Sequence, residues 1–168
     1  SRELLAEDYA YQIKRLAHPK LHSPIFGLMS EYIVGLKEYA ETLRKIADTL
    51  PKDTHLDLRD FPLEGVEIVD ASTYRIKIKG KYPQFIYWLA MPFFAPIPWE
   101  AERFYSQPGL AEKNITLDWY PVGTGAYMLV ENDPNRIMVL ERNPYFQGEY
   151  YPADGMPEDE ESGLLADA

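Results

Sequence analysis

The sequence contains no cysteine and only three histidines. The first absence excludes disulfide bonds, thiol nucleophiles and metal sites with thiolate ligands, but it does not fix the compartment. No apolar run is long enough to span a bilayer, and no signal peptide is visible. Basic residues are outnumbered by acidic ones, 17 to 27, which gives a formal net charge of −10. Because phosphate backbones repel such a chain, nucleic-acid binding is not expected.

The motifs of common enzyme classes are also missing. The chain has no Gly-x-Ser-x-Gly elbow, no phosphate-binding loop and no dinucleotide-binding glycine fingerprint. His18 and His22 have the spacing of a helical metal pair, but Pro19 breaks the helix that would align them. Glu67 falls on the wet face of a predicted strand, where a carboxylate is ordinary. We therefore expect no catalysis, no metal site and no cofactor.

Two stretches have the apolar spacing of amphipathic helices. Residues 5–17 place apolar side chains on one face, and Asp8 lies in the first turn, where the helix dipole favours an anion. Residues 30–50 show a longer repeat, with Ser30 as the expected N-cap and Pro51 as the stop. The polar face of this second helix is most simply solvated, although it could instead bind a partner.

Two antiparallel hairpins are predicted, the first from alternating apolar and polar residues and the second from two β-prone runs. The first covers residues 66–78, with one wet face. The second joins residues 126–130 to residues 137–140 through a turn rich in Asn, Asp and Pro. Together with the helices and a further short helix at 99–105, these hairpins indicate an α+β fold. The sequence suggests no internal boundary before residue 147, and residues 148–168 are predicted to form an acidic, mobile tail.

The most pocket-like composition lies between residues 82 and 99. Residues 82–91 predict a short buried helix, since a proline early in the segment precedes an almost wholly apolar run. Residues 92–99 contain three prolines, which predict an extended segment rather than a helix. Its aromatic side chains, Phe93, Phe94 and Trp99, either face a cleft or plug the core.

A second unusual segment leads into the second hairpin. Gly123 and Gly125 flank Thr124, so the backbone can adopt conformations closed to other residues. One interpretation is that something passes close to this backbone. The alternative is ordinary turn geometry.

Five pieces of sequence carry a resemblance to a known family. Pro-Val-Gly-Thr-Gly-Ala-Tyr at 121–127 and Val-Leu-Glu-Arg-Asn-Pro-Tyr-Phe at 139–146 are similar to the Gly-Thr-Gly-Pro-Tyr and Arg-Asn-Pro-x-Tyr signature of extracellular solute-binding protein family 5. Residues 6–16, 65–76 and 91–98 resemble further pieces of the family pattern in the same order. The family comprises the oligopeptide-, dipeptide- and nickel-binding receptors of bacterial ABC importers.

The resemblance implies a two-lobed periplasmic-binding-protein-like fold of type II. Residues 1–147 would then be a partial solute-binding lobe, a middle portion of a longer chain whose signal peptide is expected upstream of Ser1. The implied location is the periplasm or the cell surface, with the protein peripheral to the membrane through parts outside this sequence. A monomer is expected.

The function implied by the resemblance is capture of oligopeptides or dipeptides between two lobes, followed by delivery to an ABC permease. Extended peptide backbone can pair with strand edges while roomy pockets accept side chains. A receptor for an oligosaccharide or a metal chelate is an alternative, as is an interaction module that docks a permease or sensor through residues 30–50. The expected ligand-binding candidates are Met91, Phe93, Phe94, Trp99, Tyr120 and Thr124.

Overall fold

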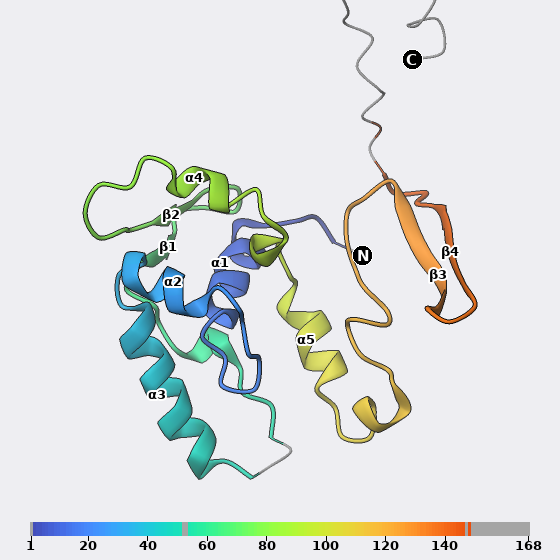
Figure 1. Ribbon diagram of the computed structural model, residues 1–168, viewed down its shortest axis with the longest axis horizontal. Helices are drawn as coiled ribbons and strands as arrows, with labels where there is room; N and C mark the ends of the chain where they lie inside the picture. Colours follow the sequence, from blue (N-terminus) through green and yellow to red (C-terminus); the bar gives the residue numbers. More distant parts are fainter. Residues whose placement is uncertain (1, 52–53, 147, 149–168) are drawn as a thin grey trace, which may run out of the picture. The chain divides into compact units, whose positions relative to one another are not determined.

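Figure 1 shows the computed structural model, which describes residues 2–51, 54–146 and 148. The chain forms two compact units, Ser1–Val122 and Gly123–Ala168, and each is described by itself. Apart from Gly148, the predicted tail at 148–168 lies outside the described residues.

Three helices build the core of the first unit: α1 (Ala6–Arg15), α2 (Phe26–Tyr32) and α3 (Leu36–Thr49). The predicted first helix is confirmed as α1. Each helix turns an apolar stripe inward, because residues three or four apart share a face. The most completely buried apolar side chains are Ile13, Met29, Ile33, Leu36, Leu43 and Leu58.

The predicted helix at 30–50 is wrong over its first turn. Ser30 lies inside α2, and the chain leaves the helical conformation at Ile33, which forms an isolated antiparallel bridge with Ile78. The helix resumes only after Gly35, whose φ of 74° is left-handed. Pairing with a segment distant in sequence therefore overrides the local helical spacing.

Gly35→Ala is expected to lower the free energy of unfolding by about 1 to 2 kcal/mol, since a left-handed conformation is unfavourable for a residue with a Cβ atom. A Cβ here would also lie 3.2 Å from Cβ of Glu64. Chemical denaturation followed by circular dichroism measures the change. Gly80→Ala is the matched comparison, since Gly80 has a φ of 70° but open space around it; its loss reports the backbone cost alone, and any greater loss in Gly35→Ala reports the contact with Glu64. An unchanged stability in Gly35→Ala would contradict the prediction.

The first predicted hairpin is confirmed as β1 (Val66–Ile68) and β2 (Tyr74–Ile76). Glu67 pairs with Arg75 across the strands, and their side chains form an exposed ion pair of 2.8 Å. This exposed face is the wet face expected from the sequence. On α1, Tyr9 stacks against Tyr74 with ring centroids 5.3 Å apart, which joins the hairpin to the helices.

Short elements follow the hairpin. They are α4 (Phe85–Trp88), the 3₁₀ turn η2 (Pro92–Phe94), α5 (Trp99–Tyr105) and the 3₁₀ turn η3 (Ala111–Lys113); a further turn, η1 (Leu58–Asp60), precedes β1. The helix predicted at 99–105 is confirmed.

Two expectations for this region are wrong. The helix expected at 82–91 is buried only in part: α4 is short, Phe85 is its one fully buried residue, Trp88 is half-buried against the core, and Ile86 and Tyr87 are exposed. The segment expected to be extended begins with η2, because Pro92 occupies a first-turn position at which its missing N–H costs nothing.

The second unit contains the predicted second hairpin, formed by β3 (Tyr127–Asp133) and β4 (Ile137–Arg142). The pairing register shifts between Leu129 and Glu131. Arg136 in the turn forms ion pairs with Glu131 and Asp133, so the tip of the hairpin is held by charged side chains.

Candidate functional site

Polar contacts from α1 hold the segment that carries most of the candidate residues. Gln12 donates from Nε2 to the carbonyl oxygen of Phe93 at 2.7 Å, and the N–H of Ile97 donates to the carbonyl of Asp8 at 3.3 Å. Farther along, Arg15 Nε lies 3.1 Å from Glu102 Oε2. The segment is thus positioned through hydrogen bonds and charge rather than by buried apolar residues of α5, none of which is fully buried.

Arg2, which precedes α1, connects this helix to α5. Its guanidinium donates to both oxygens of Asp8, at 2.6 and 2.8 Å, and to both oxygens of Glu100, at 2.7 and 2.8 Å. The hydrogen bonds from Arg2 lower the pKa of Glu100. Asp8 is only 1% exposed and also accepts the N–H of Leu5 at 2.9 Å, which satisfies a donor at the start of α1. The Asp8 carboxylate therefore caps α1 and, through Arg2, is connected to Glu100 at the start of α5.

Trp99 is held by a second cation. The Arg59 guanidinium lies 3.4 Å from the centre of the Trp99 ring, a cation–π contact. Asp57 orients the same guanidinium through a contact of 2.6 Å, and this hydrogen bonding lowers the pKa of Asp57. Because Arg59 covers one face of the indole, the remaining exposed surface of Trp99 has a fixed orientation.

The structure separates the six candidates by exposure. Phe94 is 4% exposed and belongs to the core, while Phe93 and Trp99 are half-buried and pack against that core. Met91 is 42% exposed and Tyr120 is 54% exposed. Of the two alternatives for Phe94, a cleft or the core, the structure places its ring in the core. The others in this group keep apolar surface that a ligand could contact.

Thr124 belongs to the second unit and is exposed. The flanking Gly123 and Gly125 do not adopt a left-handed φ. A Cβ built on Gly123 would have no described atom within 4 Å, and at Gly125 the nearest is the carbonyl oxygen of Tyr127 at 4.0 Å. Within the described residues, nothing approaches this backbone closely, so the chain itself does not require glycine at either position.

Asn143 is the residue of this region that the sequence did not single out. Its side chain is buried and donates from Nδ2 to the carbonyl oxygen of Gly125 at 2.8 Å, while its backbone N–H donates to the carbonyl oxygen of Ala126 at the same distance. Its Oδ1 accepts the N–H of Tyr145 at 3.0 Å. The two signature motifs are therefore directly bonded to each other. In the sequence, Asn143 appears only as a member of the Arg-Asn-Pro-x-Tyr piece of the signature, and nothing there gives its hydrogen-bond partners.

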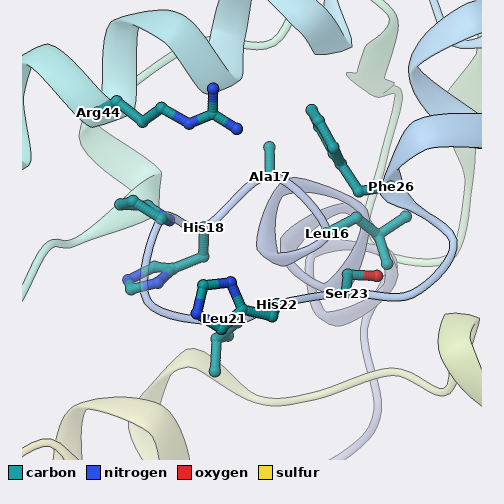
Figure 2. A pocket seen from close by; sticks show the side chains of 9 residues that line it. Leu16, Ala17, His18, Leu21, His22, Ser23, Phe26 and Arg44 are labelled. Carbon is teal, nitrogen blue, oxygen red and sulfur yellow. The ribbon is translucent and has the colours of Figure 1, made fainter.

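Two cavities of the first unit are lined by none of the six candidates. One, of about 540 Å³, lies at the start of α3 between Tyr39 and Phe61, with Glu38, Glu64 and Lys79 at its margin. The other, of about 290 Å³, follows the end of α1 and is drawn in Figure 2. Its lining includes His18 and His22, which the sequence had suggested only as an improbable metal pair.

In the part of the chain that the structure describes, no group of three or more His, Asp or Glu side chains is arranged to hold a metal ion. Over the same residues, no helix combines the length and apolarity needed to cross a membrane.

Comparison with known protein families identifies the family of this chain. Residues 2–156 match the family described as bacterial extracellular solute-binding proteins, family 5, middle region. The chain therefore belongs to this family, and the match supports a solute-binding role in bacterial transport. Membership implies a type II periplasmic-binding fold, with which the mixed helices and antiparallel hairpins agree. A comparison with curated proteins gives no match.

Proposed function

We propose that this chain takes part in capturing oligopeptides or dipeptides for a bacterial ABC importer, in the periplasm or at the cell surface. Membership of the solute-binding family is the observation that carries the transport part of the proposal. In the proposed mechanism, two lobes close around the ligand, and contacts from both lobes stabilise the closed state before delivery to a permease.

The peptide part of the proposal is supported by the candidate segment. Met91, Phe93 and Trp99 offer apolar surface, and the contacts from Gln12 and Arg59 hold that surface in place. A fixed apolar wall can accept many side chains without demanding one sequence, which suits a ligand whose constant part is its backbone. Tyr120 and Thr124 add exposed polar atoms to the proposed set.

Native mass spectrometry of the full-length protein, purified without unfolding, tests the ligand class. A ladder of masses that matches mixed short peptides would support the proposal. A single defined mass of another chemistry, such as an oligosaccharide or a metal chelate, would keep the transport role and overturn the peptide assignment.

Met91→Ala is expected to weaken peptide binding about five- to thirtyfold, since truncation removes apolar contact worth about 1 to 2 kcal/mol. Isothermal titration calorimetry on the full-length protein measures the change. Leu28→Ala is the matched control, because Leu28 is similarly exposed, on α2, and is not a candidate. Equal affinities for the two variants would remove Met91 from the proposed site.

A further inference from the structure

The cavity after α1 has an unusual charge for this chain. Its volume is about 290 Å³, and its polar lining side chains are His18, His22, Ser23 and Arg44. The other lining residues are apolar, so no carboxylate lines it. In a protein with a formal net charge of −10, a cavity that gathers an arginine and two histidines without an acidic residue departs from the surrounding surface.

The basic groups come from two elements that are distant in sequence. Figure 2 shows Arg44 reaching from its helix toward the cavity, with His18 and His22 on the loop that follows α1. Within the described ranges, the side chains of Arg44 and His22 form no hydrogen bond or ion pair with another residue. Their donor groups are therefore available to a ligand.

His18 has a fixed tautomer in its neutral form. Its Nδ1 accepts the backbone N–H of Lys20 at 3.2 Å, so the proton of the neutral ring is assigned to Nε2, which can donate. Burial lowers the pKa of His18; Glu102 on α5 acts in the opposite direction, while Arg15, Lys20 and His55 add to the lowering. His18 therefore serves as a neutral donor at neutral pH.

We propose that this cavity binds a small oxyanion, with Arg44 supplying the charge and His18, His22 and Ser23 supplying hydrogen-bond donors. A guanidinium and imidazole N–H groups suit the oxygens of a sulfate, a phosphate or a carboxylate. The volume is at the lower end of ligand pockets, so it fits a small anion or the anionic group of a slightly larger molecule. None of the proposed peptide-binding residues lines this cavity.

Sulfate is the best first probe, because its charge is constant across the range in which histidine titrates. Calorimetric titration of the full-length protein at constant ionic strength is expected to show saturable sulfate binding. A parallel titration with acetate distinguishes a tetrahedral oxyanion from a carboxylate. The anion should raise the pKa of His18, so sulfate affinity should increase as the pH falls from about 8 to about 5, by about tenfold for each pKa unit gained on binding.

Arg44→Gln is expected to weaken sulfate binding by about tenfold or more, because a charge-assisted contact is lost. Lys45→Gln is the matched control, since Lys45 is the next residue of α3, is exposed and does not line the cavity. It removes the same net charge and should change the affinity by less than about twofold, as expected for a screened surface charge. Circular dichroism verifies that both variants are folded.

Histidine NMR gives a second readout that needs no substitution. Sulfate should shift the ring resonances of His18 and His22 more than those of His55, which does not line the cavity. Equal weakening in the two glutamine variants would mean a general charge effect and would overturn the proposal. An absence of saturable binding by either anion would also overturn it.

Discussion

Gly65→Ala is expected to lower the free energy of unfolding by about 3 kcal/mol, the upper part of the range for an overpacked interior. A Cβ atom on Gly65 would lie 2.3 Å from the carbonyl oxygen of Val34, 2.9 Å from Cγ2 of Ile33 and 3.0 Å from the Val34 nitrogen. Two of these three atoms belong to backbone, so no flexible side chain can move aside to relieve the overlap. The approach occurs directly before β1, beside the bridge between Ile33 and Ile78, and an alanine would push residues 33–34 away from residue 65.

Urea denaturation of Gly65→Ala and Gly27→Ala tests this directly. Gly27 lies in α2, and a Cβ there would meet nothing within 4 Å. Gly27→Ala is therefore expected to stabilise the protein by about 0.5 to 1 kcal/mol, since alanine loses less backbone entropy in a helix. If both variants unfold at the same urea concentration, the close approach at Gly65 is not a constraint on the fold.

Asp8→Asn is expected to destabilise the protein by about 2 to 3 kcal/mol. Breaking a buried ion pair typically costs about 3 to 5 kcal/mol, and the lower figure applies here because Arg2 is 35% exposed. In this variant Arg2 would still form its ion pair with Glu100, but its two hydrogen bonds to residue 8 would no longer be made to a charged carboxylate. The hydrogen bond that the Leu5 N–H donates to this side chain would weaken as well. Thermal unfolding followed by circular dichroism measures the loss.

Glu7→Gln is the control for Asp8→Asn. Glu7 neighbours Asp8 in the first turn of α1, but in the described part of the chain it forms no ion pair. Its replacement removes the same charge from the same end of the helix dipole and should cost less than about 1 kcal/mol. Equal losses in the two variants would mean that Asp8 acts only on the helix dipole, which is the role that the sequence alone suggests.

The parts of the fold that the sequence predicts correctly have strong local periodicity. Residues of α1, of α3 after Gly35 and of the first hairpin repeat at helical or strand spacing, so local pattern and tertiary structure agree. The first turn of the expected helix at 30–50 has helical spacing too, but Ile33 pairs with Ile78 instead. Nothing near Ile33 in the sequence identifies that partner, so the error could not be avoided from local pattern.

The candidate site shows a similar division. Composition alone draws attention to Phe93, Phe94 and Trp99, but exposure depends on which side of the chain meets the core. Proline at the first position of η2 sets the turn that places Phe94 inside. The anchors Asp8 and Gln12 act on residues far along the chain, and no spacing rule connects them. Their roles appear only once α1 and the segment near Phe93 are packed together.

The two histidines after α1 show how an exclusion can leave a feature unseen. α1 ends at Arg15, so His18 and His22 lie beyond the helix. The chain forms a loop there, and this loop brings both rings to one cavity with Arg44 of α3. Sequence spacing could not connect them to Arg44, because the contact depends on how α1 and α3 pack.

The bonds of Asn143 have a consequence for how this hairpin can change in evolution and in engineering. Asn143 forms hydrogen bonds to Gly125 and Ala126, which join the two strands at the base of the hairpin. The tip, at Pro134 and Asn135, is held by exposed charged and polar contacts. Extra residues, a reporter peptide or an affinity tag inserted at the tip would leave the register at the base in place. The hairpin can thus tolerate variation in length at its tip, but not at the asparagine that closes it.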